Sequence, residues 1–178
     1  MARRWRMPVA AVMASVLLLT GCANLPIDLL LPPRPSASDG APAEAVFLAP
    51  LRGTPADAEA LRHPSLAVKI DNHEAARPQL ALNRSDLVFE ELVEGGLTRY
   101  LAVWHSDVPE EVGPVRSIRP MDPAIASPFG GIIAYSGGQP AFVDLMKATP
   151  LVNLVFDEDA TGLFERAEDR PSPHDVIL

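Results

Sequence analysis

Three arginines are the residues of this sequence best suited to bind a ligand. Arg116 and Arg119 lie three positions apart in "EVGPVRSIRPMD", and Arg99 follows a glycine pair in "EGGLTR". A guanidinium group binds carboxylate or phosphate through two parallel hydrogen bonds, so several that converge form an anion site. We therefore expect Arg99, Arg116 and Arg119 to bind an anionic ligand. The alternative is internal pairing with acids that lie nearby in the sequence, namely Glu90, Glu91, Glu94 and Asp122.

A glycine turn is expected to add backbone donors to this site. The segment "SGGQP" places Gly137 and Gly138 just before Pro140, which opens an amphipathic stretch. Backbone N–H groups at the start of a helix favour a bound anion. We also include His174, in "SPHD", as a polar residue of the site.

Metal binding has little support in the sequence. The histidines show no short spacing typical of metal ligands. The stretch from Asp157 to Glu168 matches a calcium loop in outline, but a strand pattern precedes it and prolines follow it, where a calcium loop needs two helices. We expect no metal and no cofactor.

Carboxylates offer a second kind of chemistry. If "LVFEELVE" is a strand, Glu91 faces opposite to both Glu90 and Glu94, which share a side. Paired carboxylates act as acid and base in hydrolases. The alternative function is therefore an envelope-polymer hydrolase or transferase, with Glu91 or Asp71 as base and the arginines as a clamp. Acids at alternate positions more often form a solvated face, so we assign no catalytic residue outside this alternative.

The first 22 residues have the pattern of an export signal. Three arginines precede an apolar run from Pro8 to Thr20, which is too short to span a bilayer. The run ends in "LTGC", where Cys22 is the only cysteine of the chain. This resembles the lipobox of bacterial lipoproteins, so we expect removal of residues 1–21 and a lipid on Cys22. A secreted protein with a chance cysteine, or an uncleaved anchor, is the alternative.

Charge and cysteine content exclude several classes of function. With Cys22 modified, no thiol remains for a disulfide or for thiolate catalysis. Removal of residues 1–21 takes three of the 15 basic residues and none of the 23 acidic ones, which leaves a formal charge of −11. This balance argues against a nucleic-acid partner and against adsorption to anionic lipid. We expect the lipid on Cys22 to hold the protein on the extracytoplasmic side of a bacterial membrane.

Composition divides the rest of the chain in two. Residues 22–64 include "LPPRPSASDGAPAEA", which is rich in Pro, Ala and Ser and typical of a tether. Residues 65–178 are expected to form one domain. The apolar run that begins at Val176 predicts a strand that is cut short, so we expect this domain to be incomplete at its C-terminus.

Periodicity predicts an α/β (mixed α+β) fold for this domain. Apolar alternation in "LAVKIDN" predicts a strand, and Gly95 and Gly96 predict a β-hairpin, although "FEEL" is also compatible with a helix. "MDPAIASPFG" predicts a short helix with Pro123 in its first turn. Residues 132–156 read as strand, helix and strand. We expect a mixed β-sheet that contains the hairpin and carries packed helices.

The stretch from residue 66 to residue 178 resembles the YerB-type lipoprotein family, a bacterial domain of unknown function. The motifs "KIDN", "ARPQ", "EGGLTR" and "GPVRSIR" recur in order, followed by "SGGQPAF" and "RPSPHDV". The sequence departs from the family pattern at Gln139, where Ser is frequent, and at Asp175, where Asn is usual. The resemblance implies a lipid anchor and a further C-terminal domain in the family, but no activity.

We therefore expect a lipid-anchored envelope protein whose domain is a binding or scaffold module. Its partner would be an anionic envelope polymer, a lipid-linked sugar or another protein. The enzyme alternative predicts that acids and arginines converge on an open concave pocket, whereas arginines buried against glutamates, with no pocket, favour a scaffold or the binding of a protein partner.

Overall fold

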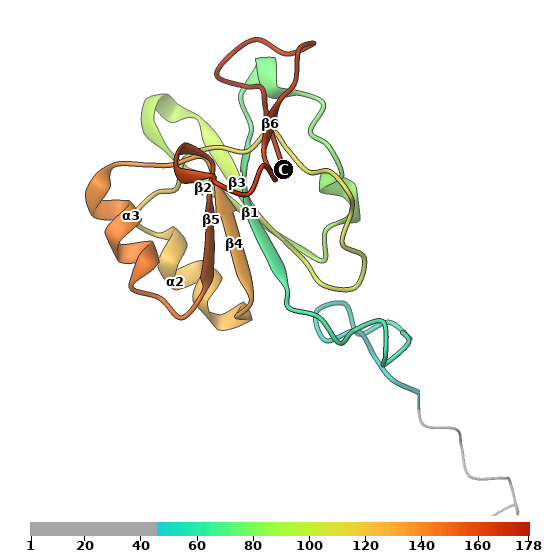
Figure 1. Cartoon of the computed structure of the whole chain (residues 1–178). Helices are drawn as coiled ribbons and strands as arrows, with labels where there is room; N and C mark the ends of the chain where they lie inside the picture. Colours follow the sequence, from blue (N-terminus) through green and yellow to red (C-terminus); the bar gives the residue numbers. More distant parts are fainter. Residues whose placement is uncertain (1–45) are drawn as a thin grey trace, which may run out of the picture. The chain divides into compact units, whose positions relative to one another are not determined.

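A computed structural model describes residues 46–178, and a five-stranded mixed sheet lies at its centre (Figure 1). The expected signal peptide, Cys22 and most of the expected tether lie outside the described residues. The strands of the sheet have the order β2-β3-β1-β4-β5. Their bounds are β1 (Leu66–Asp71), β2 (Leu87–Leu92), β3 (Thr98–Trp104), β4 (Ile132–Tyr135) and β5 (Val152–Val155).

One half of the sheet is antiparallel and the other half is parallel. β1 pairs antiparallel with β3, which forms the expected hairpin with β2. On its other edge β1 pairs in parallel with β4, and β4 with β5. The short 3-10 helix η4 (Glu94–Gly96) closes the hairpin, where Gly95 and Gly96 have φ of 71° and 74°. The strand form of "FEEL" is thus confirmed, but β2 ends at Leu92, so Glu94 does not share a strand face with Glu90.

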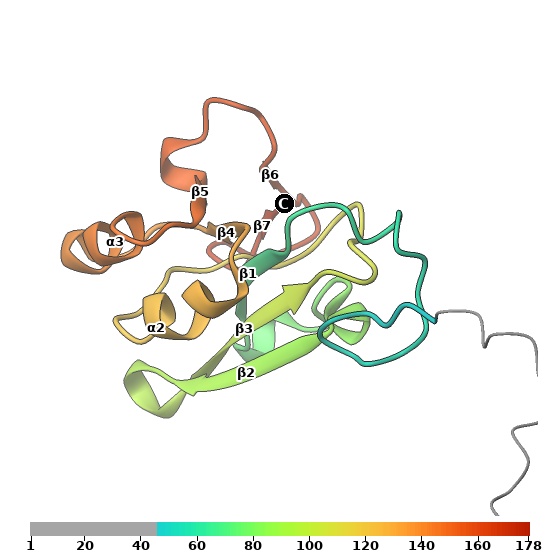
Figure 2. The ribbon, with the colours of Figure 1, turned by 90° about the horizontal axis from the view of Figure 1, so that it is seen from below.

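Two helices cover one face of the sheet (Figure 2). They are α2 (Asp122–Ala126) and α3 (Pro140–Lys147), and each has a proline in its first turn, where the missing N–H costs no hydrogen bond. α3 makes the crossover between the parallel strands β4 and β5. Apolar residues of both helices pack on Ala67, Leu101, Val103, Ile133 and Tyr135. The expected mixed α/β fold is confirmed.

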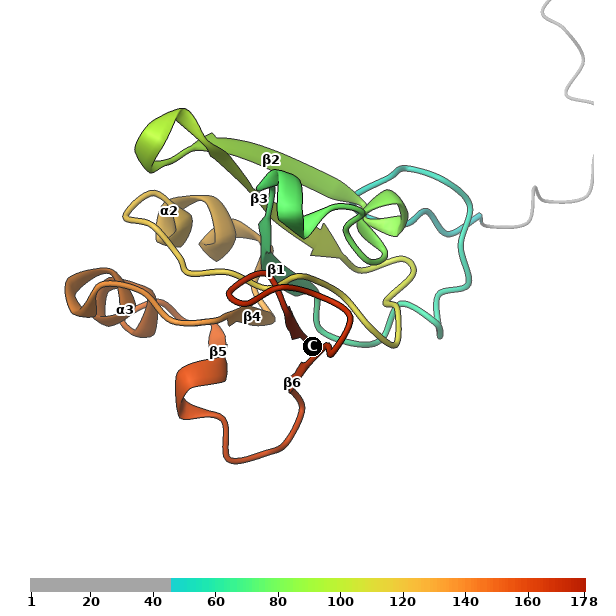
Figure 3. The same ribbon diagram turned by 90° about the horizontal axis from the view of Figure 1, so that it is seen from above.

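Loops and short turns cover the opposite face. Trp104, which is fully buried, packs there with Val68, Ile70 and loop residues Val112 and Val115. Figure 3 shows the C-terminal segment, drawn in red, beside these loops. The remaining elements are η2 (Glu74–Ala76), η3 (Leu82–Arg84), η5 (Ser127–Phe129), η6 (Phe156–Glu158), β6 (Glu165–Arg166) and β7 (Val176–Ile177).

Residues 46–64 contact the domain ahead of the expected boundary at residue 65. Ala49 is buried, and Leu51 packs against the core on the helix side of the sheet. Arg52 Nε lies 2.7 Å from Asp86 Oδ1, just before β2. The last part of the expected tether is therefore held on the domain. Within residues 46–178, no helix has the length and apolar character needed to cross a membrane.

Candidate functional site

The loop of residues 113–119 fills the gap between the carboxyl ends of β1 and β4. The backbone N–H of Arg116 donates to Lys69 O at 2.8 Å, and Ser136 N donates to Arg116 O at 3.0 Å. Ligand sites of open α/β sheets lie outside the carboxyl ends of strands, where neighbouring connections leave in opposite directions. In this fold that position is taken by the loop that carries Arg116 and Arg119.

The three arginines predicted to bind a ligand converge at this edge of the sheet; we call them the arginine cluster. Arg99, near the start of β3, donates from Nη1 to Ser117 O at 2.6 Å. Arg119 Nη1 lies 3.4 Å from the same oxygen and 2.8 Å from Ile118 O. The turn of the β2–β3 hairpin and the loop before α2 thus bring distant parts of the sequence together.

Two of the three arginines have carboxylate partners. Arg119 donates from Nε and Nη2 to Glu94 Oε2 at 2.9 and 2.7 Å, and these hydrogen bonds lower the pKa of Glu94. Arg116 Nε lies 3.0 Å from Asp71 Oδ2, although its N–H does not point at that oxygen. Internal pairing with Glu94, one of the acids named above, therefore describes Arg119, whereas the partner of Arg116 is Asp71, which was not among those acids.

Arg99 differs because no carboxylate of residues 46–178 lies within ion-pair distance of it. The residue is only 9% exposed. Burial, followed by repulsion from Arg119 and Arg116, lowers the pKa of Arg99 to about 10. The fold thus holds a nearly buried guanidinium whose charge is incompletely compensated, which is unfavourable in the absence of an anion.

Asp71 connects His174 to the arginine cluster. Asp71 Oδ2 lies 2.6 Å from His174 Nδ1, and Oδ1 accepts from the backbone N–H of His73 at 3.0 Å. The His174 ring stacks on His73 with centroids 4.4 Å apart. With Nδ1 held by the carboxylate, Nε2 of His174 is left for another partner. His73 was missed because a single histidine after a strand carries no spacing signal.

Glu91, the other base of the enzyme alternative, lies in a buried ion cluster. Lys69 Nζ donates to Glu91 Oε2 at 2.8 Å and to Asp122 Oδ1 at 2.7 Å, and the Lys69 and Asp122 side chains are fully buried. Burial, together with repulsion from Asp122, raises the pKa of Glu91 to about 7 despite the Lys69 contact. Lys69 was also missed, yet a lone lysine inside the apolar strand "LAVKIDN" is a usable signal, because a buried cation needs acids around it.

Because the pKa of Glu91 is raised in the folded state, we expect the contribution of Glu91 to the free energy of unfolding to decrease as pH rises. Between pH 4.5 and about 7 the folded state holds a proton that the unfolded state has lost. Glu91→Gln keeps the shape of the side chain and the acceptor for Lys69. At pH 8 we expect the free energy of unfolding of this variant to exceed that of wild type by on the order of 1 kcal/mol. Urea unfolding at pH 5, 6.5 and 8 measures this difference. A difference that does not change with pH would contradict the assignment.

Gly137 and Gly138 lie at the end of β4 beside the loop of the arginine cluster, where Ile118 N donates to Gly137 O at 3.0 Å, and they line a hollow. A Cβ at Gly137, whose φ is 146°, would overlap Asp157 Oδ2. The hollow has a volume of about 270 Å³, and its charged lining residues are Asp144, Lys147, Asp157 and Glu158. The two glycines therefore contact the loop of the arginine cluster, and the hollow that they line is surrounded mostly by acids.

The segment that resembles a calcium loop closes on itself. Asp159 Oδ1 accepts from the backbone N–H and the hydroxyl of Thr161, at 2.8 and 2.5 Å. Residues 46–178 contain no group of three or more His, Cys, Asp or Glu side chains arranged to hold a metal ion.

Comparisons with known proteins agree with this architecture. A family model described as the N-terminal domain of a protein of unknown function (DUF3048) matches residues 51–178. The chain belongs to this family. It is 36% identical over 129 residues to the "Putative lipoprotein YerB" of Bacillus subtilis (strain 168). This match covers 71% of this chain and 38% of the relative. The crystal structure of YerB protein from Bacillus subtilis has a TM-score of 0.69 at 34% identity, over 74% of this chain and 46% of that chain.

These findings confirm the family resemblance drawn from the motifs. The chain spans less than half the length of the relatives that it matches. Of the two departures from the family pattern, Gln139 is the N-cap of α3 and makes no side-chain cap bond. Asp175 accepts from Arg166 Nη1 at 2.8 and 2.9 Å, so its negative charge is paired.

Proposed function

We propose that this protein is a lipid-anchored envelope protein whose arginine cluster binds an anionic envelope component. A wall polymer or a lipid-linked sugar pyrophosphate has the required chemistry. The lipobox-like motif at Cys22 and the lipoprotein name of the Bacillus subtilis relative support the anchor. Arg99 carries the binding proposal, because it is nearly buried and has no carboxylate partner in the described part of the chain.

A bound phosphate or carboxylate would stabilise this cluster in two ways. It would accept charge-assisted hydrogen bonds, and it would offset the repulsion that Arg99 experiences from Arg116 and Arg119. The Glu94 side chain is 63% exposed, so its ion pair with Arg119 contributes little to stability and can be exchanged for a ligand. The arginine cluster is therefore a local cationic site on an otherwise acidic protein.

A thermal-shift titration of the full chain tests this proposal. The probes are inorganic pyrophosphate and UDP-N-acetylglucosamine, which contains the pyrophosphate–sugar linkage of a lipid-linked sugar. Because a ligand that binds only the folded state stabilises it by mass action, we expect Tm to rise with probe concentration. Arg99→Met removes one charge-assisted contact, so we expect it to weaken the apparent affinity at least about tenfold.

Arg62→Met is the matched control. Arg62 lies 3.3 Å from Glu59 on the surface, and both side chains are about three quarters exposed, at 74% and 75%. Like Arg99→Met, this control replaces an arginine by the shorter methionine and removes one positive charge. Equal weakening in both variants would show that only the net charge matters, and a wild-type Tm that does not respond to either probe would contradict the proposal.

One observation favours a second candidate function, the hydrolase or transferase. The His174 and Asp71 pair resembles a histidine base whose Nδ1 is oriented by a carboxylate. In that case Asp71 orients the base, His174 accepts the proton and the arginines stabilise developing charge. Cleavage of UDP-N-acetylglucosamine by wild type, lost in His174→Gln while the thermal shift persists, would favour the enzyme. Binding without cleavage of this probe favours the binding module.

A further inference from the structure

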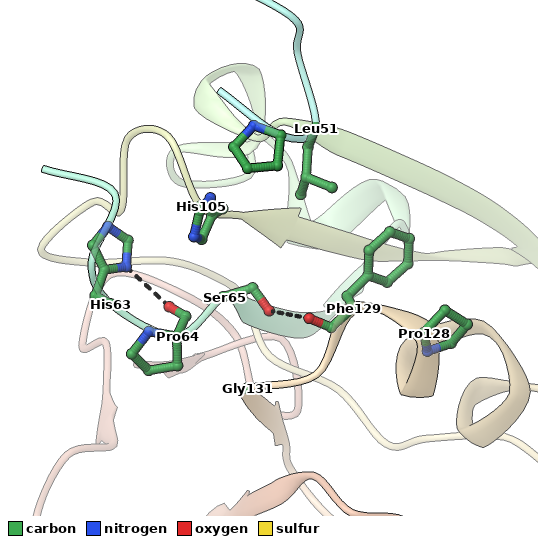
Figure 4. Close-up of a pocket in the computed structure, with 9 residues that line it drawn as sticks. Leu51, His63, Pro64, Ser65, His105, Pro128, Phe129 and Gly131 are labelled. Atoms are coloured by element: carbon green, nitrogen blue, oxygen red, sulfur yellow. Dashed lines mark hydrogen bonds between the residues drawn. The ribbon is translucent and has the colours of Figure 1, made fainter. Parts of the chain in front are cut away.

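Figure 4 shows a second hollow. Its residues precede β1 and β4 and follow β3, so it lies at the other end of these strands from the arginine cluster. It is bounded by Ser65 before β1, Gly131 before β4 and His105 after β3, with Leu51 from the segment ahead of the domain. Its volume of about 390 Å³ falls within the range of small-molecule sites. Prolines, Leu51 and Phe129 make most of its wall apolar, and none of the lining residues is an acid, a lysine or an arginine.

Two histidines supply polar atoms that the fold leaves unused. His105 Nδ1 is buried and has no hydrogen-bond partner within residues 46–178. His63 Nδ1 lies 3.0 Å from Pro64 O, a contact that requires the proton on Nδ1 and makes Nε2 an acceptor. The two ring centroids are 5.1 Å apart. Because an unpaired buried polar atom is unfavourable, the His105 nitrogen favours a ligand that can pair with it.

The remaining polar group of the wall is already paired. Ser65 Oγ lies 3.2 Å from Phe129 O (Figure 4) and 3.0 Å from Gly130 O, so its proton is committed to the backbone. A ligand therefore finds imidazole nitrogens as its main polar partners and apolar surface elsewhere. A charged ligand would lose its hydration without gaining an opposite charge, so this wall favours an uncharged one.

We propose that this hollow binds a small phenol-type compound, with its hydroxyl beside His63 and His105 and its ring against Leu51 and Phe129. A hydroxyl has one proton to donate and two lone pairs that accept, so it can donate to the Nε2 of His63 and accept from the Nδ1 of His105 in the tautomer that carries the proton on Nδ1. The apolar walls take up the ring and exclude water from these hydrogen bonds. This site shares no residue with the arginine cluster, so each proposal can fail without the other.

An NMR titration of the full chain with phenol and with toluene tests this inference. The two probes have nearly the same shape, and only phenol has the hydroxyl. We expect phenol to shift the imidazole resonances of His63 and His105 saturably, and toluene to bind at least about tenfold more weakly. Equal affinity for the two probes would overturn the role of the hydroxyl. A lack of saturable shifts up to the solubility limit of phenol would overturn the site.

Variants locate the bound probe. His105→Phe keeps a ring in the wall but removes the nitrogens, and we expect it to lower phenol affinity at least about tenfold. His73→Phe, at the other end of the sheet, is the matched control: the His73 side chain accepts only from the exposed backbone N–H of Ala75, and the substitution should leave phenol affinity unchanged. Phenol binding that survives His105→Phe, or that is lost equally in both variants, would overturn the inference. If His105→Phe does not fold, the comparison of phenol with toluene still decides the question.

Discussion

Lys69→Met is expected to lower the free energy of unfolding by about 3–5 kcal/mol at pH 8, which is enough to unfold a marginally stable domain. Lys69 Nζ bonds both Glu91 and Asp122 in a position with no exposure to solvent. Without the ammonium group, two buried carboxylates would lose their shared cation. Urea unfolding followed by circular dichroism measures the loss.

Two comparisons separate this effect from the loss of a surface ion pair. Lys147→Met removes a lysine whose bond to Glu158 joins side chains that are 42% and 54% exposed, and we expect it to cost at most about 1 kcal/mol. Adding Glu91→Gln to Lys69→Met removes one of the two stranded charges and should restore part of the stability. A Lys69→Met variant as stable as Lys147→Met would show that the buried ion cluster does not stabilise the fold.

Gly131→Ala is expected to lower the free energy of unfolding by roughly 3 kcal/mol or more. Gly131 has φ of 72°, and an added Cβ would overlap the backbone oxygen of Ser65. This oxygen cannot move freely, because it accepts from Ile132 N at 2.9 Å where β1 and β4 meet. The clash would therefore have to separate the starts of the two strands. The same urea unfolding experiment measures it.

Gly162→Ala is the control for the backbone conformation alone. Gly162 also has φ of 72°, but nothing lies within 4 Å of the Cβ that the substitution would add. We expect only the cost of a left-handed alanine there, about 1 kcal/mol. If the two variants lose the same stability, the close approach of Gly131 to Ser65 is not a constraint on the sheet.

Local patterns in the sequence were sufficient to predict most elements of the sheet. Apolar alternation predicted β1, the paired glycines predicted the hairpin, and the prolines at 123 and 140 predicted where α2 and α3 begin. These signals succeed because each depends on backbone preferences within a few residues. The motifs were also sufficient to predict the family, which the match over residues 51–178 confirms.

The contacts of the site were decided by the tertiary structure. The sequence drew attention to the arginines, but it contained no sign that Arg116 would lie between the ends of β1 and β4 or that Arg99 would have no ion-pair partner among residues 46–178. Lys69 meets Asp122 across 53 positions, and Asp71 meets His174 across 103. Such pairs depend on strand order and loop course, which no local pattern specifies.

The hollow at His63 and His105 also depends on contacts that the sequence alone did not predict. The sequence predicted no function for either histidine, because neither has a neighbour in the sequence that would make it a metal ligand or a base. They come together only because the segment before β1 and the end of β3 meet at one edge of the antiparallel pair. The sequence thus determined most strands of the sheet, the starts of the two helices, the family and the residue types able to bind an anion. The tertiary structure decided which charges are paired and which polar atoms remain for a ligand, because pairing and burial depend on residues brought together from distant parts of the chain.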